Sequence, residues 1–119
     1  MTKRLVKIYV AGAYSADNVL DVLSNIRRGI RASTEIFLAG YSPFCPWLDY
    51  HFQLQLQDNE VLTVKDFYEY SLAWLMVSDI MVVLPDSENS KGTQAEIAAA
   101  KENDIPVMTY DQFKKEMMV

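Results

Sequence analysis

The stretch "SENSKGTQAEIAAA" (87–100) combines groups that can hold an anion with a carboxylate that can act as a nucleophile. Ser90 supplies a hydroxyl and Lys91 a positive charge, directly before Gly92 and an alanine-rich helical segment. At the start of such a helix, unpaired backbone N–H groups and the helix dipole attract anions. We therefore expect a phosphate-binding turn here, although the spacing of a Walker A loop is absent.

Glu96 is the only acid between Gly92 and Lys101. It follows Gly92 by about one helical turn, so it can point back toward a ligand at the turn. We expect the helix N-terminus to keep it ionised, and an ionised carboxylate there can attack a sugar anomeric carbon, as in retaining glycosidases. The simpler alternative is that Glu96 lies in the first helical turn and only complements the helix dipole.

The other reactive side chains carry weaker signals. Cys45 is the only cysteine, lies between two prolines, and has no neighbouring partner that marks a nucleophile, so we expect it to be buried. His51, the only histidine, is expected to pack or face solvent within "WLDYHF". Metal-ligand spacing is absent, and we expect neither a metal nor an organic cofactor.

The elements that must position these residues alternate between strand and helix. Apolar or β-branched runs predict strands in "RLVKIYVAG" (4–12), "YSPFCP" (41–46), "DIMVVLP" (79–85) and "IPVMTY" (105–110). Helices are predicted between them and in "DQFKKEMM" (111–118), whereas 47–59 has no clear period. This alternation indicates a parallel sheet with right-handed crossovers. The predicted fold class is α/β, a flavodoxin-like or Rossmann-like three-layer sandwich with a small parallel sheet.

Two of the predicted helices have further sequence signals. The first is expected to begin at an Asp17 N-cap and to end before Gly40. The second falls within 60–78, where one helical face is expected to carry Val64, Phe67, Ser71, Trp74 and Leu75.

In a parallel α/β sheet, ligands bind outside the carboxyl ends of the strands. Two loops are expected at that edge, "AGAYSADN" (11–18) and "PDSENSKG" (85–92). The first loop is not a dinucleotide-binding fingerprint, because it has one glycine where three are required. The sheet edge between these loops is therefore the expected ligand site.

Composition narrows the class of protein. The length of 119 residues indicates one domain, 1–119. The net charge of −5 argues against a nucleic-acid polymer as partner, although a local loop can still bind a small phosphorylated ligand. No apolar run approaches the roughly 20 residues that span a bilayer, so no membrane partner is expected. With one cysteine, we expect a soluble cytoplasmic protein.

Three segments in fixed order resemble the nucleoside 2-deoxyribosyltransferase superfamily, which includes the 2'-deoxynucleoside 5'-monophosphate N-hydrolases. They are "IYVAGAYS", "AWLMVSDIMVVLP" and "SKGTQAEIAAA", the last followed by "IPV". The resemblance covers 7–107 and is weakest over 47–65. No single motif is decisive, and the order and spacing of all three carry the resemblance.

The resemblance implies a role for each residue at a matching position. Glu96 corresponds to the nucleophile that captures deoxyribose at C1', and Tyr9 to the first-strand tyrosine near the sugar. Gly12, Ala13 and Tyr14 belong to the loop that would form a wall around the sugar.

The position six residues before the nucleophile separates the two kinds of family member. Nucleoside transferases tend to have aspartate there, whereas the nucleotide hydrolases have a serine that holds the 5'-phosphate. Here the residue is Ser90, and Lys91 and Gly92 follow it. A hydroxyl can donate to a phosphate that a carboxylate would repel, which favours the hydrolase-like interpretation.

One position departs from the family pattern. Ser71 stands where the family usually has an aspartate that assists at the nucleobase and the nucleophile. Serine cannot serve as an acid near neutral pH, so either another acid acts there or turnover is inefficient. Asp49 in "WLDYHF" is the candidate for that acid.

The expected function is cleavage, or transfer, of the N-glycosidic bond of a 2'-deoxynucleoside, in the form of its 5'-monophosphate, through a glycosyl-enzyme on Glu96. Two alternatives remain open: base exchange between nucleosides, and a non-catalytic nucleotide-binding or sensing module, which Ser71 favours. The expected partner is a small nucleoside or nucleotide. The resemblance also implies a homodimer or larger homo-oligomer.

Overall fold

The computed structural model describes residues 2–118 and contains a four-stranded parallel sheet in the order β2-β1-β3-β4. The strands are β1 (Lys7–Ala11), β2 (Ser42–Phe44), β3 (Ile80–Val83) and β4 (Val107–Thr109). In the register of the sheet, Tyr9 lies opposite Phe44 on one side and Met81 on the other. The predicted α/β fold with a small parallel sheet is confirmed.

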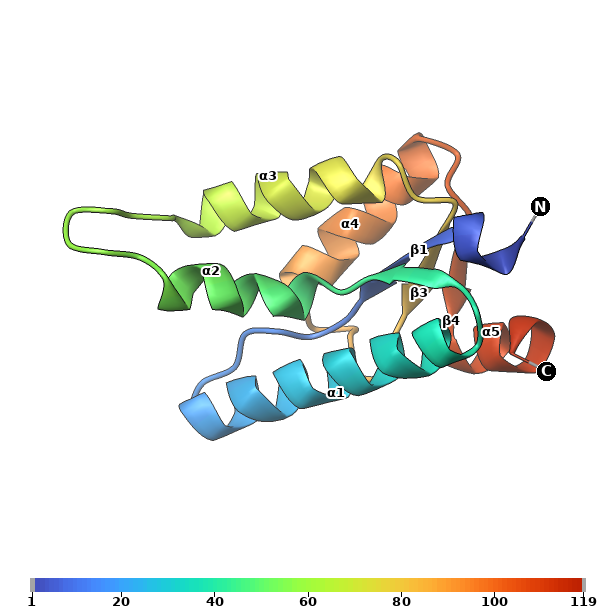
Figure 1. Ribbon diagram of the computed structural model, residues 1–119, viewed down its shortest axis with the longest axis horizontal. Coiled ribbons are helices and arrows are strands. Elements are labelled where there is room, and N and C mark those ends of the chain that lie inside the picture. The colour runs from blue at the N-terminus through green and yellow to red at the C-terminus, as the bar shows by residue number, and fades with distance from the viewer. Residues whose placement is uncertain (1, 119) are drawn as a thin grey trace.

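Helices cover both faces of the sheet and complete the three layers (Figure 1). Helices α1 (Val19–Leu38) and α5 (Tyr110–Met117) lie on one face, and α3 (Val64–Leu75) and α4 (Lys91–Glu102) lie on the other. The shorter helices are η1 (Lys3–Leu5), η2 (Pro46–Asp49) and α2 (Tyr50–Leu54). None of the helices in residues 2–118 combines the length and apolar character needed to span a membrane.

The side chains of β1 alternate between the two cores, as the period of a strand requires. Ile8 and Val10 pack with residues of α1 and α5, whereas Tyr9 and Ala11 pack with residues of α3 and α4. All four side chains are buried. Tyr9 is therefore an aromatic side chain of the α3/α4 core that carries a polar hydroxyl into it.

Helix α1 starts one residue later than predicted. The N-cap is Asn18, whose backbone is extended and whose side chain accepts a hydrogen bond from the Asp21 N–H at 2.9 Å. The predicted cap, Asp17, lies outside the helix. At the other end Gly40 has a φ of 106°, a left-handed conformation that favours glycine and ends the helix as predicted.

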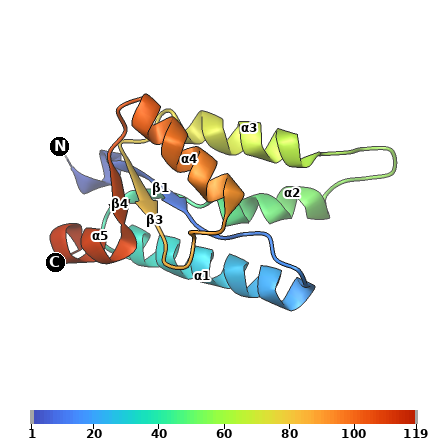
Figure 2. The same cartoon turned by 180° about the vertical axis from the view of Figure 1, so that it is seen from behind.

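Only part of the apolar face predicted for α3 is buried. Ser71 and Leu75 are buried, but Val64 is 87% exposed and Trp74 is 47% exposed. The helix begins at Val64 after a capping box formed by Thr63 and Asp66, and its first turns extend with α2 beyond the sheet (Figures 1 and 2). The helical period was correct, but it does not show which turns the sheet covers.

Trp47 anchors the segment for which the sequence gives no clear period. Its side chain is buried, and its indole N–H donates to the Ala13 carbonyl at 3.1 Å. It also packs against Gly29 of α1, where an added Cβ would lie 2.1 Å from the indole ring. A glycine is therefore required at this helix–indole contact. The contact fixes η2, and with it Asp49, beside the loop that follows β1.

Candidate functional site

Tyr9 and Glu96 form a hydrogen-bonded pair in the α3/α4 core. The Tyr9 hydroxyl donates to Glu96 Oε2. Glu96 belongs to the second turn of α4, because that helix begins at Lys91, so its predicted place in the first turn is wrong. The pair joins the central strand β1 to α4.

The surroundings of the pair decide its protonation. Burial raises the pKa of Glu96 to about 7, and the hydrogen bond from Tyr9 opposes this only in part. Burial, followed by the charge of Glu96, also raises the pKa of Tyr9, which therefore remains a donor. Burial therefore opposes the ionisation that the helix N-terminus is expected to favour, because the dipole acts mainly within the first turn.

Ser71 lies on the same side of the sheet as this pair. Its side chain is buried on α3 and lies close enough to the Tyr9 hydroxyl to oppose, in part, the rise that burial causes in the pKa of Tyr9. Three elements, α3, β1 and α4, therefore bring Ser71, Tyr9 and Glu96 together. A hydroxyl, rather than a carboxyl, is the group that α3 contributes.

Asp49 and Tyr14 form a second pair nearby. The Tyr14 hydroxyl donates to Asp49 Oδ1 at 2.8 Å, and Asp49 is 8% exposed. Burial raises the pKa of Asp49, with the Tyr14 hydrogen bond acting in the opposite direction. The charge of Asp49 also contributes to the raised pKa of Tyr9, so the two pairs lie within electrostatic reach of each other.

The residues predicted to hold a phosphate lie at the start of α4. Ser90 is the N-cap: its Oγ accepts from the Thr93 hydroxyl at 2.8 Å and from the Thr93 N–H at 3.3 Å. These two bonds leave the Ser90 O–H available as a donor. Lys91 and Gly92 are exposed beside it. No described contact joins this group to the Tyr9–Glu96 pair.

The loop after β1 is tightly packed at its first residues. A Cβ added to Gly12 would lie 3.1 Å from Leu84 and 3.2 Å from Trp47, so a side chain there would require its neighbours to move. The Ala13 carbonyl is the acceptor for Trp47. Of the three predicted loop residues, Tyr14 alone places a functional group beside a candidate acid.

An aromatic stack next to Tyr9 was missed by the sequence analysis. The Phe44 ring stacks on Tyr9 and on Trp74, with centroids 5.6 Å apart in both cases. Phe44 also lines a cleft of about 370 Å³ together with Asp49, Phe52 and Tyr70. The only sequence signal was the abundance of aromatic residues, because the pairing of Tyr9 with Phe44 depends on strand register.

The remaining candidates stay outside this arrangement. Cys45 is buried, as predicted, and burial raises the pKa of its thiol. His51 is exposed on α2. Within residues 2–118, no group of three or more His, Cys, Asp or Glu side chains is arranged to hold a metal ion.

Comparisons with known proteins place this geometry in context. Residues 6–110 match the sequence pattern of a protein family described as a domain of unknown function (DUF7768). No curated protein matches the chain in sequence. Among solved structures, a 2-deoxyribosyltransferase from the psychrotolerant bacterium Bacillus psychrosaccharolyticus has the same fold, with a TM-score of 0.63 and 19% identity. The alignment covers 87% of this chain and 71% of that one.

Proposed function

The chain belongs to the DUF7768 domain family, and we propose that it cleaves the N-glycosidic bond of 2'-deoxynucleosides, with their 5'-monophosphates as the preferred form. The observation that carries this proposal is the hydrogen-bonded pair between β1 and α4, in which Tyr9 is fully buried and Glu96 partly buried. A carboxylate with a tyrosine hydroxyl bound to one oxygen has its other oxygen available for attack on a sugar carbon. Two further observations support chemistry at this bond: the fold shared with a 2-deoxyribosyltransferase, and the three sequence segments that resemble its superfamily.

The proposed reaction has two steps. In the first, ionised Glu96 forms a bond to C1' while the bond from C1' to the base nitrogen breaks and the base accepts a proton. In the second, water attacks C1', releases the carboxylate, and gives up a proton. Transfer to a second base in place of water would make the same chain a deoxyribosyltransferase.

Asp49 is the proposed source of the proton for the leaving base. The position on α3 where the resembled superfamily usually has an aspartate holds Ser71 here. Serine cannot supply a proton near neutral pH. Burial raises the pKa of Asp49, so part of its population carries a proton at a pH where an exposed aspartate does not. In the second step the Asp49 carboxylate would take a proton from the attacking water, which restores the starting state.

The pH dependence of cleavage follows from the raised pKa of Glu96. In Asp49→Asn, which has no acidic proton at this position, only Glu96 of the two groups titrates, so kcat/KM of that variant should rise with pH and level off above about 7, the pKa of the Glu96 carboxyl group. Below that pKa, the rate should fall about tenfold for each pH unit. Initial rates between pH 5 and 9 measure this limb. A rate already on its plateau at pH 5 would contradict the role of Glu96 as an attacking carboxylate.

The substrate assay tests the proposed function directly. Each of the four 2'-deoxynucleosides and its 5'-monophosphate is incubated with the protein, and free base is measured by chromatography. If Ser90 and Lys91 hold the phosphate, the monophosphates should react ten- to a hundredfold faster, since a charge-assisted hydrogen bond contributes roughly 1.5–3 kcal/mol. Equal rates for both forms would remove the phosphate-binding assignment and favour base exchange, which a second added base would reveal.

A non-catalytic nucleotide-binding module is the second candidate function, and Ser71 is the observation that favours it. Nucleotide binding without release of free base would support this alternative. Because both candidates use the same site, binding alone cannot separate them, and the assay for free base can.

We also propose that the chain assembles as a homodimer or larger homo-oligomer. Helices α2 and α3 extend together beyond the sheet (Figure 1). Their apolar side chains remain exposed, among them Phe52 at 51%, Leu54 at 60% and Val64 at 87%. Clustered exposed apolar residues of this kind are typical of protein–protein contacts.

A further inference from the structure

We propose that the chain has a second ligand site, for a small organic phosphate, on the face of the sheet opposite the Tyr9–Glu96 pair. A cleft of about 350 Å³ lies between α1 and α5 and reaches the loops that follow β1 and β3. Strand order reverses between β1 and β3, and ligands of open α/β sheets bind at such switch points. The proposed function uses the α3/α4 side of this edge and leaves the α1/α5 side unassigned.

Three cations converge on this cleft from two helices. Arg28 and Arg31 come from successive turns of α1, and Lys114 comes from α5. The Arg28 guanidinium donates to Oδ1 of the buried Asn25, which holds it in place. The Lys114 ammonium lies 4.6 Å from the centroid of the Tyr110 ring. Two of the cations are therefore positioned by neighbouring side chains before any ligand binds.

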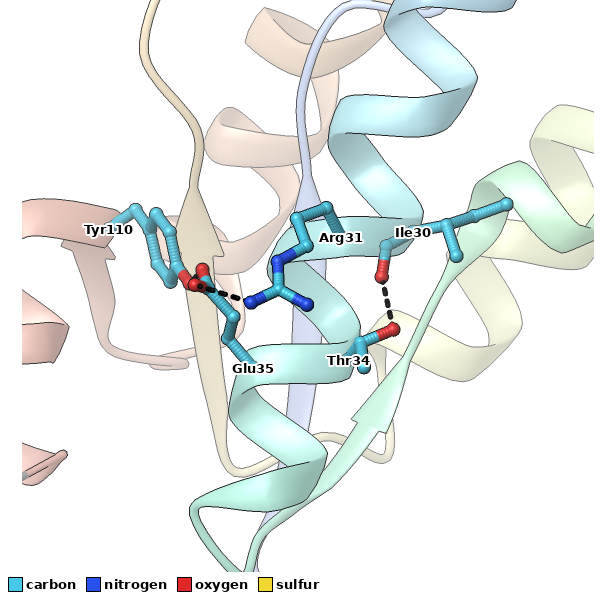
Figure 3. Close-up of polar contacts among 5 residues, drawn as sticks. All are labelled: Ile30, Arg31, Thr34, Glu35 and Tyr110. Carbon is cyan, nitrogen blue, oxygen red and sulfur yellow. Dashed lines mark hydrogen bonds and ion pairs between the residues drawn. The ribbon is translucent and has the colours of Figure 1, made fainter.

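Glu35, the first of three carboxylates in the cleft, is already engaged. Tyr110 and Arg31 converge on it from opposite sides, as Figure 3 shows. The Tyr110 hydroxyl donates to Oε1, and Arg31 Nη2 lies 3.4 Å from Oε2. This carboxylate therefore orients Arg31 and Tyr110 at the wall of the cleft.

The other two carboxylates are held loosely. Asp86 lies 4.0 Å from Arg28, and its side chain is 83% exposed. Asp111 lies 3.8 Å from Lys114, and its side chain is 74% exposed. Exposed ion pairs at such distances contribute little, so a phosphate with several acceptor oxygens can replace them as the partner of Arg28 and Lys114.

The size and lining of the cleft indicate the class of ligand. Ala32, Leu84 and Pro85 form apolar walls beside the cations. The volume lies near the lower end of the range for small-molecule sites. An organic phosphate of mononucleotide size or smaller can place its phosphate at the cations and its organic part against these walls.

The chain offers a matched control for two of the cations. Arg27 precedes Arg28, and Lys115 follows Lys114; both are exposed, and neither lines the cleft. Binding of inorganic pyrophosphate and of adenosine 5'-monophosphate is measured by calorimetry at low ionic strength. We expect Arg28→Gln and Lys114→Gln each to weaken binding ten- to a hundredfold, and Arg27→Gln and Lys115→Gln to change it less than about threefold.

A variant that binds more tightly provides a further control, because unfolding can only weaken binding. Asp86→Asn removes the carboxylate that competes for Arg28, so it should tighten binding about three- to tenfold. Ser90→Ala should weaken only binding at the Ser90 site, and the binding that Arg28→Gln weakens should persist in this variant. The proposal is overturned if neither probe binds, if the control variants lose as much affinity as the cleft variants, if Asp86→Asn weakens binding, or if Ser90→Ala abolishes it.

Discussion

Glu96→Gln is expected to reduce release of free base from 2'-deoxynucleoside 5'-monophosphates by at least about a thousandfold, which corresponds to roughly 4 kcal/mol of transition-state stabilisation. Glutamine keeps the size of the side chain and can still accept a hydrogen bond from Tyr9. It lacks the anionic oxygen that forms the bond to C1'. Among the described contacts, no other carboxylate lies against the Tyr9 hydroxyl, so no substitute nucleophile is in place.

Glu102 provides the matched control for this experiment. It is exposed at the last turn of the same helix, and Glu102→Gln makes the same chemical change outside the site. The Glu102→Gln variant should retain the rate of the unmodified chain. Near-native turnover in Glu96→Gln would remove the nucleophile assignment, as would an equal loss in both variants.

The parallel sheet could be predicted because its strands carry clear signals. "DIMVVLP" is a continuous apolar run of the kind found in a strand covered on both faces, and it contains β3. Gly40 marked the end of α1 for an equally local reason. Asn18 was missed because two neighbouring residues were both suitable caps, and only the backbone path decides between them.

The residue types of the site could also be predicted, but their environment could not. The resemblance to the deoxyribosyltransferase superfamily brought Tyr9 and Glu96 into one hypothesis, and the structure joins them by a hydrogen bond. The pKa of Glu96 depends on how much protein surrounds the carboxyl group, which the sequence does not specify. The place of Phe44 depends on the register between β1 and β2 in the same way.

Glu96→Gln should also stabilise the fold, and this gain should grow with pH. The pKa of Glu96 is about 7 in the folded chain against an ordinary value of 4.5, so the folded state holds more protons between these values. Stability contributed by this group is therefore fully present below pH 4.5 and is lost as pH rises through 7. Glutamine has no charge to bury, so the variant avoids this loss.

The shift in pKa sets the size of the gain. It corresponds to up to about 3 kcal/mol in the free energy of unfolding. Urea unfolding of the unmodified chain and of Glu96→Gln at pH 5 and at pH 8 measures it. At pH 8 the midpoint of Glu96→Gln should lie well above that of the unmodified chain, and at pH 5 the two should lie close together.

Burial of a carboxylate that must be ionised to react links the two effects of this single change. The surroundings that raise the pKa of Glu96 destabilise the ionised folded state, and the same surroundings exclude water from a nucleophile. One variant should therefore lose activity and gain stability, a combination that a folding defect cannot produce. Glu102→Gln should do neither, because its side chain is exposed. If Glu96→Gln shows no more stability at pH 8 than the unmodified chain, then Glu96 is not destabilised by burial and the rise in activity near pH 7 must have another origin.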